Sequence, residues 1–180
     1  MKTLDRFLRG WRYRMAERYV PDGSRLLDIG GFDGSFLNLV SHRISGGVCI
    51  DPLIEDKVDG KIVFIKSYIT ERLPFPEDSF DLVTMLAVFE HLSLLREQIV
   101  KEVYRVLSVH GKVILTVPNN SVDKILRVLI QLKLVDGMSL EEHDHFPPGD
   151  TIRCFTGNGF TLRHHRTFQM GLNNLFVFEK

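Results

Sequence analysis

The sequence predicts an α/β fold: a doubly wound, mostly parallel sheet with helices on both faces and an antiparallel strand at the carboxyl end. Short runs rich in β-branched residues alternate with longer helical patterns, as in right-handed β-α-β crossover units. Several of these runs are apolar almost continuously, which is typical of strands buried on both faces of a parallel sheet. The last two runs are separated by a loop too short for a crossover helix, so they are expected to pair antiparallel.

Each element can be placed along the chain. The expected parallel strands are Arg25–Ile29, Val48–Ile50, Ile62–Ile65, Phe80–Met85 and Lys112–Val117. The expected C-terminal hairpin pairs Phe160–Phe168 with Leu175–Phe178. An amphipathic helix is expected between the fourth and fifth strands, with Ser93 as its N-cap and Gly111 just past its end. A further helical pattern starts after Asn120. No linker or repeat interrupts the chain, so we expect one domain over residues 1–180.

The composition excludes several classes of protein. The chain has 180 residues, of which 44% are hydrophobic and 26% charged, close to ordinary globular usage. Its 23 basic and 23 acidic side chains give a net charge of zero, which disfavours a nucleic-acid partner. No apolar run reaches the roughly 18 residues of a membrane span. Cys49 and Cys154 show neither a disulfide framework nor a metal-type spacing, so we expect a cytoplasmic protein.

A glycine-rich turn follows the first expected strand. Residues Arg25–Gly34 read RLLDIGGFDG and lead into a helical segment at Ser35. Glycines let a turn approach a ligand closely, and ligands of open α/β sheets bind outside the carboxyl ends of the strands. The spacing fits neither the dinucleotide fingerprint nor a phosphate-binding P-loop, which disfavours a nicotinamide-dependent reductase. The turn is expected to hold another nucleotide-like cofactor.

An acidic residue ends the second expected strand. Asp51 follows Val48–Ile50 and lies 23 residues after Asp28. A carboxylate at this place can accept hydrogen bonds from both hydroxyls of a ribose. The alternative is that Asp51 only caps the loop before Pro52. The glycine turn nearby favours the ribose role.

Four motifs in order resemble those of a known family. They are LLDIGGFDGSFL, VCIDP, LPFPEDSFDLVTMLAVFEHL and EVYRVLSVHGKVILTVPN. Together they are similar to the class I S-adenosylmethionine-dependent methyltransferases, in particular the small-molecule branch called methyltransferase type 11. The resemblance runs from Leu26 to Asn119 and resumes weakly over His143–Phe160. It implies a Rossmann-like, seven-stranded sheet with an antiparallel last strand, and S-adenosylmethionine as cofactor, with S-adenosylhomocysteine as its product.

The resemblance also implies a role for each motif. The turn from Asp28 to Gly34 would hold the methionine part, Asp51 the ribose, and the segment after the fourth strand the sulfonium end. Two positions depart from the family pattern: Phe32 stands where a glycine is usual, and Tyr68 stands where an acidic residue usually meets the adenine. The implied cofactor site comprises Asp28, Gly30, Gly31, Phe32, Gly34, Asp51, Pro52, Leu53, Tyr68, Ile69, Leu86 and Ala87.

Three histidines are the candidate catalytic bases: His91, His143 and His145. An oxygen nucleophile needs a group that takes its proton, and histidine titrates near neutral pH. His91 follows the fourth expected strand; its alternative role is to order that loop. His143 and His145 belong to a polar cluster that could form a solvated loop, a wall of the acceptor pocket or a metal site, and we assign no metal ligands.

The N-terminal segment, residues 1–20, is expected to be a basic amphipathic helix. Leu4, Phe7, Leu8, Trp11 and Met15 share one face of it. Such a helix packs on the sheet or over a cofactor, makes a peripheral contact with an anionic membrane, or holds an acidic substrate. The leading hypothesis for function is methyl transfer to a small molecule, such as a lipid or glycan precursor. The alternative is a catalytically impaired protein that keeps the methyltransferase fold as a binding module.

Overall fold

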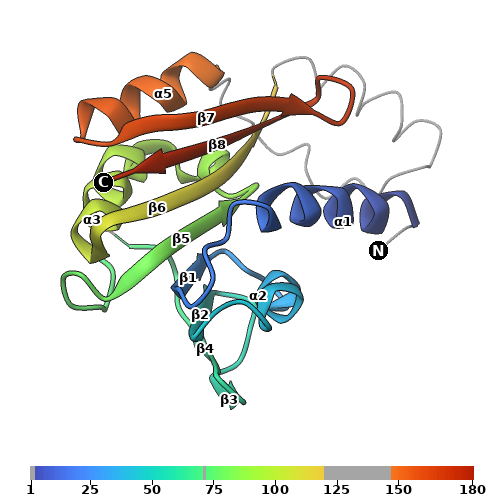
Figure 1. Cartoon of the computed structure of the whole chain (residues 1–180), viewed down its shortest axis with the longest axis vertical. Coiled ribbons are helices and arrows are strands. Elements are labelled where there is room, and N and C mark those ends of the chain that lie inside the picture. Colours follow the sequence, from blue (N-terminus) through green and yellow to red (C-terminus); the bar gives the residue numbers. More distant parts are fainter. Residues whose placement is uncertain (1–2, 71, 120–146) are drawn as a thin grey trace.

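The computed structural model describes residues 3–70, 72–119 and 147–180. One mixed sheet of eight strands organises these residues, in the order β3-β4-β2-β1-β5-β6-β8-β7 (Figure 1). The strands are β1 (Arg25–Ile29), β2 (Gly46–Asp51), β3 (Lys57–Asp59), β4 (Ile62–Lys66), β5 (Phe80–Leu86), β6 (Leu107–Pro118), β7 (Thr161–Phe168) and β8 (Asn173–Glu179). The helices are α1 (Thr3–Glu17), α2 (Ser35–Val40), the 3-10 helix η1 (Phe89–Leu95), α3 (Arg96–Val106) and α5 (Pro148–Gly157).

The sheet confirms the predicted topology. Strands β4, β2, β1, β5 and β6 are parallel neighbours, and β8 pairs antiparallel with both β6 and β7. Because the order reverses direction between β1 and β5, the carboxyl ends of these two strands border the crevice where ligands of open α/β sheets bind. The sheet has eight strands and not the expected seven, since the exposed strand β3 adds an antiparallel edge to β4.

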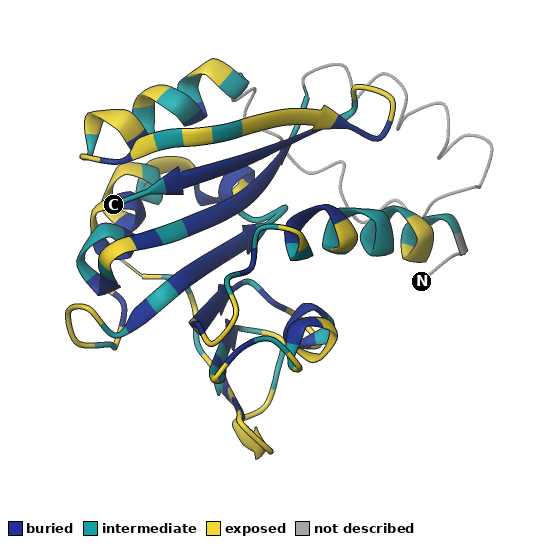
Figure 2. Ribbon diagram, in the orientation of Figure 1, coloured by how far each residue is buried: buried dark blue, intermediate teal, exposed yellow. Residues whose placement is uncertain are grey.

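Helices cover both faces of the sheet, as predicted. On one face α1 and α2 contribute Met15, Ala16 and Phe36 to a buried cluster. On the other face α3 and α5 pack against the sheet, and the ring of Phe155 stacks on that of Phe178 with 4.5 Å between centroids. The burial colouring shows the central strands buried and β3 exposed (Figure 2). Apolar burial on both faces explains why these strands read as continuous hydrophobic runs.

The region before α3 differs from the sequence expectation. The helix begins at Arg96 with Leu95 as its N-cap, so the expected cap at Ser93 is wrong. Ser93 instead lies at a kink within η1, with a φ of 39°. Strand β6 begins at Leu107, directly after α3, so that Gly111 lies inside the strand and not past a helix end. The strong apolar period of α3 marked the helix but carried no information about its first turn.

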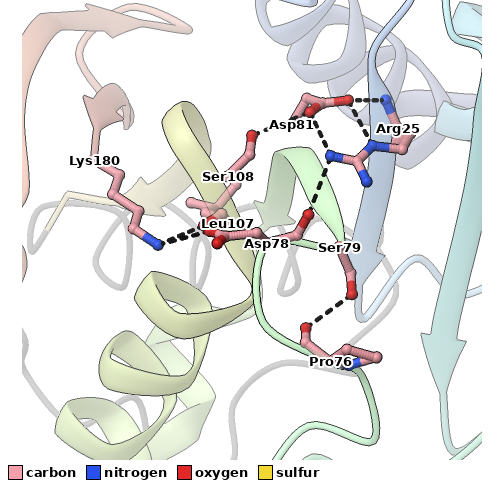
Figure 3. Close-up of polar contacts among 8 residues, drawn as sticks. All are labelled: Arg25, Pro76, Asp78, Ser79, Asp81, Leu107, Ser108 and Lys180. Atoms are coloured by element: carbon pink, nitrogen blue, oxygen red, sulfur yellow. Dashed lines mark hydrogen bonds and ion pairs between the residues drawn. The ribbon is translucent and has the colours of Figure 1, made fainter.

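A polar network lies at the amino ends of the central strands, opposite the carboxyl ends that border the ligand crevice (Figure 3). The guanidinium of Arg25 donates to both carboxylate oxygens of Asp81, over 3.0 Å from Nε and 2.8 Å from Nη2. The same carboxylate accepts the Ser108 hydroxyl at 3.0 Å, and Lys180 donates to the Leu107 carbonyl at 2.6 Å. These contacts join the amino ends of β1, β5 and β6. The network therefore holds the amino ends of these strands together, whereas the glycine turn and the segment after β5 lie at the carboxyl ends.

Helix α1 is amphipathic, but only its last turns are buried. Met15 lies in the core, whereas Phe7 of the predicted apolar face is 61% exposed. The helix is held by polar contacts: the Leu8 carbonyl accepts a hydrogen bond of 2.7 Å from Gln169 Nε2, and Arg9 forms an ion pair of 3.0 Å with Asp33. Among the described helices, none is long and apolar enough to cross a bilayer.

Candidate active site

The glycine turn has the backbone shape that its sequence requires. The φ angles of Gly30, Phe32 and Gly34 are 71°, 49° and 70°, all in the left-handed region. A Cβ on Gly30 would lie 2.4 Å from a methyl of Val88, and one on Gly34 would lie 2.3 Å from the ring of Phe64. Glycine is therefore needed at both places for its conformation and for space. Phe32 adopts the left-handed conformation with its side chain 49% exposed, so its ring does not fill the turn.

Asp28 lies beneath this turn at the carboxyl end of β1. It is 2% exposed, and its Oδ1 accepts a hydrogen bond of 2.6 Å from the Thr84 hydroxyl on β5. Its Oδ2 is buried with no hydrogen-bond partner among the described residues, and a Cβ on Gly31 would lie 2.5 Å from it. Burial raises the pKa of Asp28 to about 7, although the Thr84 hydrogen bond opposes the rise. The site thus contains a buried carboxyl oxygen that lacks a donor.

Asp51 joins the glycine turn to the loop after β2. Its Oδ2 accepts the backbone N–H of Phe32 at 3.0 Å, and its Oδ1 accepts that of Leu53 at 2.8 Å. A carboxylate oxygen has two lone pairs, so each can still accept one further hydrogen bond. The capping role that the sequence left open is therefore real, and it orients the carboxylate without using up its capacity.

Exposed apolar side chains border Asp51. The Ser67 N–H donates to the Asp51 carbonyl at 3.2 Å, which brings Tyr68 to this edge of the sheet. Tyr68 is 77% exposed, and Leu53 and Phe32 are also exposed. Pro52 is half-buried, and Ile69 packs against the core beneath. The expected adenine-side residues thus lie around the end of β2, with rings and aliphatic groups available to a flat ligand.

The segment after β5 lies against the glycine turn. The Ala87 N–H donates to the Thr116 carbonyl at 3.2 Å, and Ala87 has a φ of 62°. The methyl groups of Val88 occupy the space above Gly30. Leu86 and Ala87 therefore lie at the carboxyl end of β5, directly before the residue that covers Gly30. His91 follows in η1 and is exposed, whereas His143 and His145 lie outside the described residues.

Sequence reasoning missed Glu90, which the structure places beside the predicted His91. Glu90 is 4% exposed, and burial raises its pKa to about 7. Its Oε2 is buried without a hydrogen-bond partner among the described residues. The available signal was a charged residue within the apolar segment Val88–Leu92, immediately after a strand that ends at the ligand edge. Within the described ranges, no group of three or more His, Cys, Asp or Glu side chains is arranged to hold a metal ion.

Comparisons with known proteins agree with this geometry. A family model described as a methyltransferase domain matches residues 27–115, about half of the chain. A ubiquinone/menaquinone biosynthesis C-methyltransferase from Xanthomonas campestris is 29% identical over 91% of this chain and 77% of its own length. One of the same description from Stenotrophomonas maltophilia is 31% identical over 58% of this chain, but the match spans only 46% of that relative.

Solved structures share the fold. An S-adenosylmethionine-dependent methyltransferase from Mesorhizobium loti superposes with a TM-score of 0.73 at 16% identity, covering 96% of this chain and all of that one. One from Methanosarcina mazei superposes with a TM-score of 0.68 at 23% identity, covering 93% and 97% of the two chains. The mostly parallel sheet with its antiparallel C-terminal strands agrees with the fold of these structures. The chain belongs to the class I S-adenosylmethionine-dependent methyltransferases, enzymes whose cofactor is S-adenosylmethionine.

Proposed function

We propose that the protein transfers the methyl group of S-adenosylmethionine to a small-molecule acceptor, a hydroxylated aromatic precursor of a quinone-type lipid. The observation that carries the cofactor half of the proposal is the pair of buried carboxylates at the ends of β1 and β2, Asp28 and Asp51. The acceptor half is supported by the relatives described as ubiquinone/menaquinone biosynthesis C-methyltransferases. Of the two acceptor classes that the sequence left open, these relatives favour the lipid precursor over the glycan precursor.

The residues present fit the cofactor. The unpartnered Oδ2 of Asp28 is suited to the ammonium of the methionine part, because a buried carboxyl oxygen without a donor is costly to leave unpaired. The turn through Gly30, Gly31 and Gly34 brings the backbone close to this group. Asp51 keeps lone pairs for the two ribose hydroxyls.

The adenine would lie among apolar groups. Pro52, Leu53, Tyr68 and Ile69 surround the place next to Asp51, and Phe32 lies on the other side of the carboxylate. The exposed ring of Tyr68 can stack on a base where the family usually offers a carboxylate. Leu86 and Ala87 would lie beside the sulfonium end. Tyr68 would thus change the contacts of the adenine, whereas Phe32 belongs to the turn that would hold the methionine part and keeps its ring exposed.

The bound cofactor supplies an electrophilic methyl group on a sulfonium. What the chain must do is align the acceptor with this methyl group and exclude water, since orientation supplies most of the rate enhancement in such a transfer. The glycine turn and Val88 position the methionine end, and Asp28 compensates its charge in a buried environment. An acceptor hydroxyl would also need a proton acceptor close to Leu86 and Ala87.

Isothermal titration calorimetry with S-adenosylhomocysteine tests the cofactor site. We expect micromolar binding by the wild type and at least about 30-fold weaker binding by Asp51→Ala, since two hydrogen bonds to a charged group are lost. Asp59→Ala, which removes an exposed carboxylate on β3, is the matched control and should bind like the wild type. Absence of both binding heat and thermal stabilisation with either cofactor form would refute the proposal.

The second candidate, a binding module without methyl transfer, rests on Phe32 and Tyr68. It also predicts cofactor binding, so the discriminating experiment is transfer of labelled methyl from S-adenosylmethionine. We expect a labelled product with 1,4-dihydroxynaphthalene, the reduced form of 1,4-naphthoquinone and a bicyclic quinol that lacks a side chain. Cofactor binding without label transfer to a panel of quinols and other hydroxylated small molecules would favour the binding module.

A further inference from the structure

One flank of helix α1 carries aromatic and cationic side chains toward solvent. Phe7, Trp11, Arg14 and Arg18 recur at every third or fourth residue, so they lie on one stripe of the helix and of the turn that ends it. Arg14 and Arg18 are exposed, Phe7 is 61% exposed and Trp11 is half-buried. The rings of Phe7 and Trp11 meet edge to face, with 5.9 Å between centroids. The flank is thus apolar near the start of the helix and basic near its end.

Strand β7 and the turn after it lie alongside this helix. The ring of Tyr19 packs on that of His164 in β7, with 4.9 Å between centroids. At the other end, Gln169 Nε2 of the turn donates to the Leu8 carbonyl of α1 over 2.7 Å. Exposed residues recur along both β7 and α1 (Figure 2). The two elements therefore form one continuous outer surface.

Two exposed side chains of the β7–β8 hairpin extend the stripe of α1. Arg166 is two residues after His164, so it projects from the same face of β7 as the residue that contacts the helix. It is exposed. Met170 directly follows Gln169 and is 89% exposed. The α1–β7 surface comprises Phe7, Trp11, Arg14, Arg18, Arg166 and Met170.

The cations of the α1–β7 surface have no counter-ions in the part of the chain that the structure describes. Arg14, Arg18 and Arg166 form neither an ion pair nor a side-chain hydrogen bond there. Arg14 and Arg18 are one helical turn apart, a spacing at which like charges repel and destabilise a helix. The two acids of α1, Asp5 and Glu17, are half-buried and lie outside the stripe. In a chain of zero net charge, this surface is a local concentration of positive charge.

Met170 is exposed at a place where another residue would be less strained. Gln169 and Met170 both have a positive φ, of 52° and 55°, and the Gly171 N–H donates to the Phe168 carbonyl at 3.1 Å. Turns with two such residues favour Asn and Gly, which adopt this conformation at little cost. Methionine instead places a flexible apolar side chain at the tip of the hairpin, in water.

An anionic lipid bilayer is the partner that matches these features. Helices that lie on a bilayer combine arginines, which contact acidic headgroups, with aromatic and aliphatic side chains, which enter the boundary of the acyl chains. A protein interface instead has a contiguous apolar centre that is depleted of charge, whereas here cations and apolar groups are interspersed. We propose that the α1–β7 surface docks the protein on an anionic bilayer. This inference goes beyond the proposed function and does not depend on it.

Docking in this way would bring the candidate active site close to lipid. The opposite flank of α1 borders the glycine turn and the helix after it, because Arg9 pairs with Asp33 over 3.0 Å and the ring of Tyr13 packs on that of Phe36, with 5.4 Å between centroids. One helix therefore connects the α1–β7 surface with the cofactor-binding turn. If the acceptor is a quinone-type lipid, it would dissolve in the bilayer on which the enzyme lies.

Fluorescence of Trp11 in the presence of vesicles tests the proposal. Trp11 is the one tryptophan of the chain, so its emission reports on this surface. The vesicles contain phosphatidylcholine with about one third phosphatidylglycerol, and are compared with vesicles of phosphatidylcholine alone. We expect the emission to shift to shorter wavelength on the anionic vesicles and to be quenched by lipids brominated in the acyl chain. Affinity for the neutral vesicles should be at least about tenfold lower.

Removal of the arginines tests the charge. Each arginine close to an anionic surface contributes about fivefold in affinity, so Arg14→Gln combined with Arg18→Gln should bind the anionic vesicles at least about tenfold more weakly. Arg166→Gln alone should bind about threefold or more weakly, since β7 belongs to the same surface. Lys101→Gln combined with Arg153→Gln removes the same charge from α3 and α5, on the other face of the sheet, and should bind like the wild type.

Met170→Asn tests the apolar part of the surface without risk to the fold. Asparagine adopts the left-handed conformation more readily than methionine, so thermal unfolding should show a stability equal to or above that of the wild type. Affinity for the anionic vesicles should nevertheless fall by about threefold or more, because the side chain that enters the bilayer is gone. Weaker binding by a variant that is at least as stable cannot arise from unfolding.

Several outcomes would overturn the docking proposal. They are an unchanged Trp11 emission on anionic vesicles, equal affinity for neutral ones, wild-type affinity in the Arg14/Arg18 variant, or vesicle binding in which brominated lipids do not quench Trp11. A dimer in sedimentation equilibrium that these substitutions dissociate, without vesicle binding, would show instead that the surface joins two copies of the chain. Calorimetry with S-adenosylhomocysteine keeps the two proposals apart: a protein that binds the cofactor but no vesicles contradicts docking alone, and the reverse result contradicts the proposed function alone.

Discussion

The hydroxyl of Thr84 donates a 2.6 Å hydrogen bond to Oδ1 of Asp28, across the pairing of β5 with β1. The two residues are direct neighbours in the parallel register, and both are buried. This bond satisfies one oxygen of the carboxyl group and leaves the other free beneath the glycine turn. The contact therefore orients a costly buried acid toward the place where a cationic ligand would bind.

Asp28→Asn is expected to stabilise the protein without cofactor at high pH. The pKa of Asp28 rises from its ordinary value of 3.8 to about 7 in the folded state. At a pH between these two values the folded state therefore keeps a proton that the unfolded state has lost. The free energy of unfolding of the wild type therefore falls as the pH rises from about 4 to about 7, by at most about 4 kcal/mol. Asparagine cannot ionise and removes this dependence.

Thermal unfolding at pH 4 and pH 8 measures this effect. The variant should be more stable than the wild type by about 1 to 4 kcal/mol at pH 8 and nearly equal to it at pH 4. It should also bind S-adenosylhomocysteine at least tenfold more weakly, because the negative partner of the ammonium is gone. A variant that is less stable than the wild type at pH 8 would show that Asp28 is ionised at little cost.

Arg25→Met is expected to have the opposite dependence on pH. The Arg25 hydrogen bonds are the main cause that lowers the pKa of Asp81 to about 2. A carboxylate with a lowered pKa contributes stability above its unfolded value of about 4, and this contribution is lost as the pH falls through 2. Both side chains are more than a third exposed, so solvent screening limits the effect to about 0.5 to 1 kcal/mol at pH 7.

The measurement is urea unfolding at pH 7 and at low pH. The difference between Arg25→Met and the wild type should shrink toward zero between pH 4 and pH 2. Arg18→Met, which removes an exposed arginine outside the network of Figure 3, is the control and should have no comparable pH dependence. A difference that is constant over this range would mean that Arg25 acts through packing alone.

Gly31→Ala is expected to damage both stability and cofactor binding. The added methyl group would lie 2.5 Å from Asp28 Oδ2 and 2.6 Å from Cys49 Sγ, so the turn must move away from the buried carboxyl group. Overpacking of this kind costs about 1 to 3 kcal/mol. Thermal unfolding and calorimetry with S-adenosylhomocysteine would measure the two losses.

Gly10→Ala provides the contrast within the same chain. Gly10 lies inside α1 with nothing within 4 Å of an added Cβ. Alanine should therefore stabilise the helix by about 0.5 to 1 kcal/mol. If the two variants had equal stability, the close approach of Gly31 to Asp28 would not constrain the turn.

Most strands of the sheet could be predicted from the local sequence. The apolar runs of β1, β5 and β6 marked a parallel sheet, and the short loop before β8 marked the antiparallel end, because these patterns reflect burial on both faces and limits of chain length. The start of α3 and the extra strand β3 were not predicted. Both depend on contacts with other elements and not on a periodic spacing of apolar residues. Strand β3, for example, is exposed and is defined by its pairing with β4.

The candidate site was likewise predicted only in part from the sequence. The sequence by itself determined the glycine turn and the acidic ends of β1 and β2, since conformational freedom at Gly30 and Gly34 and the position of a carboxylate at a strand end are local properties. Only the tertiary structure decided that Asp28 and Glu90 are buried and that each keeps a carboxyl oxygen without a partner among the described residues. The burial and electrostatic environment of a side chain depend on neighbours that folding brings together, so the spacing of residues along the chain does not predict them.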